Sequence, residues 1–358
     1  MGRQVRVVDT DVHPLPRSVD ELREYLREPW RSVPDTLLDS GPLLLYLATG
    51  QPYRRDAMPD DGGPAGSDPV LAAEQLLGSA GVDYAILLPL VRTFPNQDLE
   101  AAMYSAMNDW LERTWLGEYD PEGSYWGSIN VSAGEPDLAV AEIERWAGHP
   151  RMLQLRFNAY AGEPYGHPKY FPIYAAAERH GLPIAVHFSK GSGTSLLTPA
   201  GFLSTYVEHH ALYPITYASH LVSLIFGGVF DRFPGLKWVF VEGGFCWVGP
   251  LLWRMDRYWS ECRAELPELK RAPSEVVRSH VRFTSQPLEE PAERGTLAKA
   301  LEWADAEHLL MFSSDYPHWD YDDPSFVVRQ LPETLHDAVF RDTALDFYRL
   351  PARRPSAG

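Results

Sequence analysis

The sequence predicts an α/β protein, a (β/α)8 TIM barrel with a long loop insertion after the first strand. Eight short β-like runs alternate with helix-like stretches, the pattern of parallel strands joined by helices. Polar residues stand at the ends of several runs, where barrel enzymes build their active sites. The length of 358 residues lies within the range of barrels that form one domain, which we expect over residues 1–350.

The eight runs predict the strands of the barrel. They cover residues 5–12, 83–89, 125–131, 152–158, 183–188, 236–242, 281–286 and 309–315. Helix signals stand between them. Pro136 opens one periodic run, and Gly181 ends the run over residues 168–180.

Two regions interrupt this alternation. Residues 14–70 are rich in Pro, Gly and Asp, and a loop this long in a compact barrel is normally functional or disordered, so we expect a lid or a dimer-contact segment there. Residues 189–218 follow the fifth predicted strand and should lie on the catalytic rim. Residues 351–358 are predicted to form a flexible tail.

Composition excludes several classes of partner. The formal net charge of −17 opposes binding to a polyanion, so nucleic acid is not expected as a substrate. No stretch approaches the roughly 18 apolar residues that a membrane span needs. The N-terminus lacks the apolar core of a signal peptide, and two cysteines are too few for a disulfide framework. We therefore expect a cytoplasmic protein with no membrane contact.

The first predicted strand carries Asp9, Asp11 and His13 on alternate positions. A strand points alternate residues to one face, which would be the barrel interior. A buried row of two carboxylates and an imidazole is costly unless a cation or hydrogen bonds compensate for it. A surface turn ended by Pro14 explains this stretch equally well when it is taken alone.

Two further polar residues end predicted strands. His187 ends the fifth strand and Asp315 ends the eighth. Alone, a strand-end histidine is more often structural, and Asp315 would serve equally as a helix cap. The carboxyl ends of barrel strands meet at one rim, however, so these two residues should join Asp11 and His13 there. The combination indicates an active site more strongly than its parts.

These motifs resemble the amidohydrolase-related branch of the amidohydrolase superfamily, which includes aminocarboxymuconate semialdehyde decarboxylase and the resorcylate and carboxyvanillate decarboxylases. The resemblance covers nearly the whole chain, through residues 9–13, 223–237 and 312–318. It implies one divalent cation held by Asp11, His13, His187 and Asp315, although the first of these is often His or Glu in the family. Such ligands suit zinc, our first choice, and also manganese or iron.

One position departs from the family pattern. The decarboxylases resemble one another in a catalytic histidine after the sixth strand, where this chain has Glu242 in Glu-Gly-Gly-Phe-Cys-Trp. A carboxylate can also shuttle a proton, especially when burial raises its pKa. Glu242 is therefore a candidate catalytic base, with Asp315 as a second candidate. The alternative is a salt-bridge anchor for Arg254 or Arg257.

Five other residues are weaker candidates. His318 follows the last metal-ligand position by three residues and is a candidate catalytic acid, or a loop cap. We assign Arg156, His210, Trp247 and Trp319 to substrate binding. The guanidinium of Arg156 needs a carboxylate partner from the protein or from the substrate. The two tryptophans would line a pocket for a flat substrate, although aromatic residues in a barrel more often form core.

The sequence leaves three functions open. The first is hydrolysis of a small aromatic or carboxylated substrate by metal-activated water, favoured by Glu242 in place of histidine. The second is non-oxidative decarboxylation of a small aromatic or unsaturated acid, in which a protein acid protonates carbon. The third is an inactive barrel used for binding, which the intact ligand positions disfavour. We also expect a homodimer.

Overall fold

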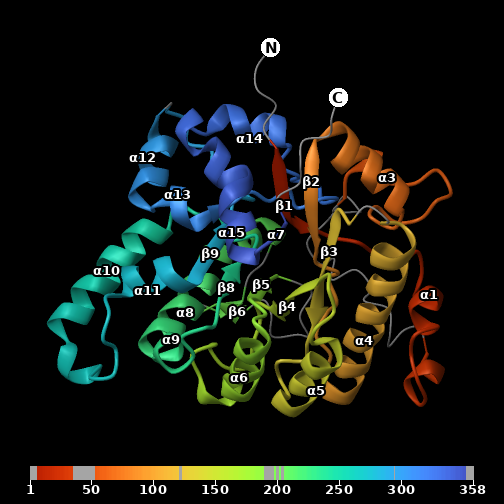
Figure 1. The fold of residues 1–358 in the computed structure, drawn as a ribbon, viewed down its shortest axis with the longest axis horizontal. Helices are drawn as coiled ribbons and strands as arrows, with labels where there is room; N and C mark the ends of the chain where they lie inside the picture. The colour runs from red at the N-terminus through yellow and green to blue at the C-terminus, as the bar shows by residue number, and fades with distance from the viewer. Residues whose placement is uncertain are drawn as a thin grey trace.

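The structure, a computed structural model, describes residues 6–34, 53–120, 123–188, 197–198, 201–202, 205–293 and 295–351. Eight parallel strands form the central sheet in the order β1-β2-β3-β4-β5-β8-β9-β10 (Figure 1). They are β1 (Val7–Val12), β2 (Val82–Leu87), β3 (Tyr125–Asn130), β4 (Met152–Asn158), β5 (Ile184–His187), β8 (Trp238–Phe240), β9 (Val281–Thr284) and β10 (Leu310–Met311). Two short strands, β6 (Leu197–Thr198) and β7 (Gly201–Phe202), pair separately.

The first and last segments of the sheet close the barrel at a seam. The amide of Thr10 donates to the carbonyl of Phe312 at 3.1 Å, and the amide of His13 donates to the carbonyl of Tyr316 at 2.7 Å. Val12 also forms a parallel bridge with Tyr316. The predicted barrel is confirmed, and the motifs at the two ends of the sequence lie side by side at this seam.

The two strands that precede the candidate acids end earlier than predicted. We expected strands over residues 236–242 and 309–315, but β8 ends at Phe240 and β10 ends at Met311. Glu242 and Asp315 have φ angles of +62° and +61°. This left-handed backbone is uncommon for residues other than glycine and cannot continue an extended strand. Both acids therefore sit on sharp turns just past the strands.

Helices surround the barrel (Figure 1). They are α1 (Val19–Arg23), α3 (Pro69–Ala73), α4 (Gln97–Trp110), α5 (Pro136–Trp146), α6 (Phe171–His180), α7 (Tyr206–Ala211), α8 (Tyr213–Phe226), α9 (Val229–Arg232), α10 (Val248–Glu261), α11 (Pro273–His280), α12 (Thr296–Trp303), α13 (Ala306–Leu309), α14 (Pro324–Gln330) and α15 (Thr343–Tyr348). None of the described helices has the length and apolar character needed to cross a membrane.

Two predicted helix boundaries are confirmed. Pro136 occupies the first turn of α5, where its missing N–H costs nothing. Gly181 follows α6 with φ +65° and donates its amide to carbonyls of the last turn. A residue without a Cβ adopts this conformation at no steric cost.

The apolar core has two parts, one between the sheet and the helices and one smaller cluster at the start of the strands. The smaller cluster combines residues from five strands with residues of α15: Val8, Ile86, Ala185, Val239, Met311, Phe347 and Tyr348. Because α15 packs against these residues, it plugs the N-terminal end of the barrel. Polar side chains gather at the opposite end, where barrel active sites are built.

The insertion after β1 returns to this catalytic end. The amide of Arg54 donates to the carbonyl of Pro317 at 2.9 Å, and Tyr53 pairs with His318. Gly66 lies so close to the residue after β1 that a Cβ at this position would come within 2.6 Å of the carbonyl oxygen of His13. Residues 35–52 of the predicted lid or dimer-contact segment lie outside the described residues, as do 352–358 of the predicted tail.

Candidate metal centre

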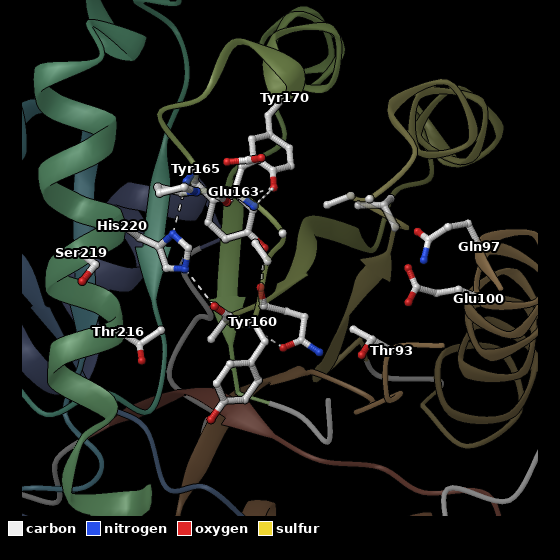
Figure 2. A pocket seen from close by; sticks show the side chains of 18 of the residues that line it. Thr93, Gln97, Glu100, Tyr160, Glu163, Tyr165, Tyr170, Thr216, Ser219 and His220 are labelled. Carbon is white, nitrogen blue, oxygen red and sulfur yellow. Dashed lines mark hydrogen bonds between the residues drawn. The ribbon is translucent and has the colours of Figure 1, made fainter. Parts of the chain in front are cut away.

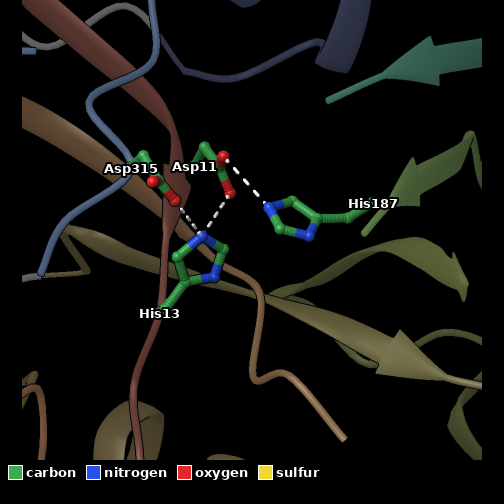
Figure 3. Close-up of side chains that lie close together, drawn as sticks. All are labelled: Asp11, His13, His187 and Asp315. Carbon is green, nitrogen blue, oxygen red and sulfur yellow. Dashed lines mark hydrogen bonds and ion pairs between the residues drawn. The ribbon is translucent and has the colours of Figure 1, made fainter. Parts of the chain in front are cut away.

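Four side chains gather at the catalytic end of the barrel, as the sequence predicted (Figure 3). Asp11, His13, His187 and Asp315 each offer a ligand atom within 4.8 Å of the others. All four residues are buried. β1 supplies Asp11, the residue just after it is His13, β5 supplies His187, and the turn after β10 supplies Asp315 across the seam. We call these four residues the metal cluster.

Backbone carbonyls orient both imidazoles of the metal cluster. Nδ1 of His13 lies 2.9 Å from the carbonyl oxygen of Leu88, and Nδ1 of His187 contacts the carbonyl oxygen of Phe188. A carbonyl only accepts, so each Nδ1 carries a hydrogen, and in a neutral ring Nε2 is left with a lone pair. Nε2 is the atom that each ring turns toward the carboxylates, which is how metal-binding histidines are held.

Several buried atoms of the metal cluster lack a hydrogen-bond partner among the described residues. They are Nε2 of His187, Oδ2 of Asp315 and both carboxylate oxygens of Asp11, which form only ion-pair contacts, at 3.1 Å with Nε2 of His13 and 3.4 Å with Nε2 of His187. An unsatisfied buried polar atom costs about 1–3 kcal/mol, and more when the group is charged. A divalent cation would satisfy all four atoms at once, so these residues fit the metal that the sequence implies.

The side chains of the metal cluster shift one another's pKa values. Burial favours neutral carboxyls, but the imidazoles of His13 and His187 outweigh it and hold the pKa of Asp11 below its ordinary value. For Asp315, His318 and His13 similarly outweigh burial and lower the pKa. Burial lowers the pKa of His187. Burial also lowers the pKa of His13, but the carboxylates of Asp11 and Asp315 outweigh it and raise the pKa well above its ordinary value. A cation would therefore displace a proton from this ring, because ionised carboxylates and neutral imidazoles are the forms that bind metals.

Asp9, the third polar residue of the predicted row, does not join the metal cluster. Its carboxylate accepts hydrogen bonds from the amide and hydroxyl of Ser314 at 3.0 and 2.6 Å and from the amide of Asp11 at 3.2 Å. The pairing of β1 with β2 is irregular between Asp9 and Val12. The side chains along β1 therefore do not alternate strictly between its two faces, and Asp9 instead joins the first and last segments of the sheet through its hydrogen bonds with Ser314.

Glu242 lies beside the metal cluster. Its Oε2 is 3.4 Å from Nε2 of His187, and its Oε1 is 3.9 Å from Nε2 of His210. Burial, followed by repulsion from the carboxylates of Asp315, Asp320 and Asp11, raises the pKa of Glu242 well above its ordinary value. The alternative that this residue anchors an arginine finds no support in these contacts, which are with imidazoles.

His318 also reaches the metal cluster. Its Nδ1 lies 2.6 Å from Oδ1 of Asp315, and its ring centre lies 4.7 Å from that of His13. The other side of the ring stacks against Tyr53 at 5.4 Å. The contact with Tyr53 could not be expected from sequence, because Tyr53 belongs to an insertion without a periodic pattern.

His210 and Trp319 stand at the rim. Nε2 of His210 lies 3.0 Å from Oδ2 of Asp320, which also accepts from the side-chain amide of Gln286 at 3.0 Å. The ring of Trp319 is half-exposed and 6.3 Å from that of His210. Asp320 was missed in the sequence, although its place five residues after Asp315, in the same turn, was an available signal.

Arg156 and Trp247 make their hydrogen bonds to other parts of the barrel. Arg156 is fully buried, and its Nη1 donates to the carbonyl of Val91 at 3.2 Å and to Oδ1 of Asn130 at 3.4 Å. The indole N–H of Trp247 donates to the carbonyls of Gly243 and Gly244, and its ring packs against the core residue Phe283. Their substrate-binding roles remain predictions. The contacts of Trp247 suit a structural role, whereas Nε and Nη2 of Arg156 are buried and have no hydrogen-bond partner among the described residues.

A cavity of about 890 Å³ has a lining that includes no residue of the metal cluster (Figure 2). The loops after β2, β3 and β4 line it together with α8. Its lining includes Asn158, which pairs with His187 in the sheet. One wall is fixed by His220, which bonds to the carbonyl of Ala159 and accepts from the amide of Tyr165. The volume is in the range of small-molecule sites.

Comparison with known proteins agrees with this fold. A model of the amidohydrolase family matches residues 8–350. Among solved structures, the chain is similar to an amidohydrolase from Mycobacterium avium subsp. paratuberculosis, with 20% identity, a TM-score of 0.71, and coverage of 97% of this chain and 98% of that chain.

Two decarboxylases are similar over comparable lengths. The 5-carboxyvanillate decarboxylase of Sphingomonas paucimobilis shares 24% identity with a TM-score of 0.68, covering 97% of this chain and 100% of that chain. The dihydroxybenzoic acid decarboxylase of a Polaromonas species, solved with manganese and the inhibitor 2-nitroresorcinol, shares 16% identity with a TM-score of 0.67, covering 97% and 98%. At these identities the likeness establishes a common fold.

Proposed function

Since the chain belongs to the amidohydrolase family, and is a metal-dependent hydrolase or decarboxylase, we propose that it catalyses non-oxidative decarboxylation of a small aromatic or unsaturated carboxylic acid. The sequence alone placed hydrolysis first. The order is reversed here, because relatives of the same fold decarboxylate aromatic acids and because the site offers a proton donor.

The main support for this proposal is the raised pKa of Glu242, which favours the protonated carboxyl group. Its raised pKa means that the carboxyl holds a proton to a higher pH than an exposed glutamate does. Hydrolysis would need a base at the position of Glu242, to take a proton from water, whereas decarboxylation needs an acid there that protonates carbon. A bound cation would offset part of the repulsion from Asp11 and Asp315 and so reduce the upward shift of this pKa.

In the proposed reaction, the bond between the substrate carbon and its carboxylate breaks and its electron pair stays on that carbon. Glu242 supplies the proton that the carbon takes up, and the carboxylate of Glu242 then regains a proton from water. The products are carbon dioxide and the decarboxylated compound, which has a new C–H bond at that carbon. Asp11, His13, His187 and Asp315 would hold a divalent cation, which would supply Lewis-acid stabilisation of the negative charge that develops on the substrate.

Other residues would bind and orient the substrate. His318 and His210 flank Glu242 and the metal cluster, and both offer hydrogen-bond donors to a substrate oxygen. Trp319 gives the rim an aromatic face on which a flat ring can stack. Manganese is our candidate for the cation, because it is bound in two decarboxylases of the same fold, and elemental analysis of the purified protein tests it.

Isotope labelling distinguishes the two reactions. Metal-loaded protein is incubated with hydroxybenzoic acids in D2O and, separately, in water enriched in oxygen-18. Decarboxylation releases carbon dioxide and leaves one deuterium at the vacated carbon, while oxygen-18 stays out of the organic product. Hydrolysis of an ester or amide in a parallel panel would instead place oxygen-18 in the product, and that outcome, without carbon dioxide from any acid, would overturn the proposal.

A matched variant tests the role of Glu242. Glu242→Gln keeps the size of the side chain but removes its transferable proton. The variant should bind the cluster cation normally and lose about 10²-fold or more in kcat, the range of general acid–base catalysis. Full activity in Glu242→Gln would contradict this role.

A further inference from the structure

One edge of the guanidinium group of Arg156 is unused. The residue is fully buried, and its Nη1 donates to the carbonyl of Val91 at 3.2 Å and to Oδ1 of Asn130 at 3.4 Å. Its Nε and Nη2 are also buried and have no hydrogen-bond partner among the described residues. No carboxylate of the described residues forms an ion pair with this guanidinium. The described residues thus leave a buried positive charge without a counter-ion, which is costly.

The unused edge of Arg156 matches a carboxylate. The N–H bonds of Nε and Nη2 lie parallel on one edge of a guanidinium, and their spacing fits the two oxygens of one carboxylate. A guanidinium only donates hydrogen bonds, so its partner must be an acceptor. A water molecule would accept a hydrogen bond there but would leave the charge of Arg156 uncompensated. The chemistry of this edge therefore favours a carboxylate that the described residues do not supply.

The hydroxyl of Tyr104 is a further buried donor, and it has no hydrogen-bond partner among the described residues. Arg156 lies close enough to act on it, because the guanidinium partly opposes the rise in the pKa of Tyr104 that burial and Glu100 cause. Two nitrogens of Arg156 and the hydroxyl of Tyr104 therefore lack an acceptor within one small region. Each unsatisfied buried donor is costly, and the oxygens of one carboxylate would satisfy all three.

Glu100 does not fill this role, although it lies in the same region. Its Oε1 accepts a hydrogen bond from the hydroxyl of Ser132 at 2.6 Å, and its Oε2 accepts one from the amide of Phe94 at 2.9 Å. Burial raises the pKa of Glu100, and the guanidinium of Arg156 only partly opposes this rise. The carboxyl is therefore ionised less readily than that of an exposed glutamate, which also weakens its repulsion of an incoming acid.

The cavity of about 890 Å³ lies next to these donors. Tyr104 and Glu100 both line it, and Glu100 lies across it from His220 (Figure 2). Four aromatic residues of the lining provide faces for a flat ring, namely Phe94, Tyr160, Tyr165 and Tyr170. The described residues of the lining include no lysine or arginine, so Arg156, behind the lining, would be the cationic partner of an acid bound there.

We propose that this cavity is a second organic-ligand site, separate from the metal cluster, for a small acid with a flat apolar body, whose carboxylate is bound by Nε and Nη2 of Arg156 and by the hydroxyl of Tyr104. Because Arg156 lies behind the lining, a rotation of the Tyr104 side chain admits the carboxylate, while the apolar body remains among the aromatic rings. The site does not depend on the proposed decarboxylation, because no residue of the metal cluster lines the cavity.

Three probes of the same shape and different charge test the site. Isothermal titration calorimetry compares 4-phenylbutyrate with 4-phenylbutanol and 4-phenylbutylamine on metal-loaded full-length protein, and then on chelator-treated protein. We expect the acid to bind at least about tenfold more tightly than either analogue, and one equivalent to bind equally well after chelation. Equal affinities for the three probes, or no binding of the acid, would overturn the proposal. So would binding that chelation abolishes while the circular dichroism spectrum stays unchanged, because the acid would then bind at the metal cluster.

Matched variants of the metal-loaded protein locate the carboxylate. Tyr104→Phe should weaken binding of 4-phenylbutyrate at least about tenfold, the effect of losing a hydrogen bond to a charged group, without lowering the stability of the ligand-free protein. Tyr174→Phe is the control, because its buried hydroxyl donates to the carbonyl of Tyr165 at 2.5 Å. It should lose stability in urea unfolding and keep its affinity for the acid.

Arg156→Lys provides a second test, since lysine keeps the positive charge but lacks the parallel pair of N–H bonds. It should also bind the acid at least about tenfold more weakly than the wild type. Wild-type affinity in Tyr104→Phe would overturn the role of the hydroxyl. Wild-type affinity in both Tyr104→Phe and Arg156→Lys would overturn the site.

Discussion

Asp9 should make the metal-free protein lose stability as the pH rises from acid to neutral. Burial raises the pKa of this carboxyl to about 7, although hydrogen bonds from Ser314 and the amide of Asp11 oppose the shift. In the unfolded chain an aspartate ionises near its ordinary pKa of about 3.9. Between these values the folded state binds more protons than the unfolded state, so the free energy of unfolding falls with rising pH.

The size of this effect follows from the two pKa values. A difference of about 3 units corresponds to ~4 kcal/mol, at about 1.36 kcal/mol per unit. Roughly 2.5 kcal/mol of it is lost between about pH 5 and pH 8, because the folded carboxyl ionises within that interval. Asp9→Asn keeps an acceptor for the amides of Ser314 and Asp11 but cannot ionise. The difference in the free energy of unfolding between this variant and the wild type should therefore shift by about 2.5 kcal/mol in favour of the variant between about pH 5 and pH 8.

Urea unfolding in the presence of a chelator measures the effect. Circular dichroism follows the transition at several pH values, and linear extrapolation gives the free energy of unfolding for each protein. Asp60→Asn, a change of the same charge at an exposed position, is the control and should track the wild type. If the curves of wild type and Asp9→Asn stay parallel across the range, Asp9 is ionised in the folded protein and the reasoning fails.

Three further expectations follow from the site. His187→Ala should abolish tight metal binding, because it removes the ligand that β5 supplies, and unchanged metal content on elemental analysis would contradict the assignment. Gly66→Ala should lower stability by about 1 kcal/mol or more in thermal or urea unfolding, because Gly66 has φ +80° and its Cβ would meet the His13 carbonyl; unaltered stability would show that the segment can shift. Asp320→Asn should raise KM or lower kcat with metal content intact, because Asp320 orients His210, and His210→Ala should produce the same change; metal loss in either variant would point to a ligand role instead.

The barrel and the placement of its four clustered residues were predictable, because both depend on local patterns and on one general rule. Asp11, His13, His187 and Asp315 stand at strand ends, and parallel strands bring their carboxyl ends to one rim. No knowledge of side-chain packing is needed for that step. Their role as metal ligands remains a prediction, which the orphaned oxygens of Asp11 support.

The rest of the site depends on turns whose backbone no sequence pattern specified. Glu242 and Asp315 leave their strands through left-handed residues, so the direction of each side chain follows from the turn and not from strand alternation. The partnership of His210 with Asp320 joins a helix after β5 to the turn after β10. Such contacts are set by packing between loops, and loop conformation is the least predictable part of a fold.

The seam between the first and last strands also determines when the metal cluster can exist. His13 and Asp315 are 302 positions apart, and a chain emerges from the ribosome with its N-terminus first. Asp11 and His13 must therefore wait until the segment after β10 is made before Asp315 can join them. On the proposed assignment, tight binding of a cation would mark a closed barrel, and products truncated before β10 would be recognised by their failure to retain metal.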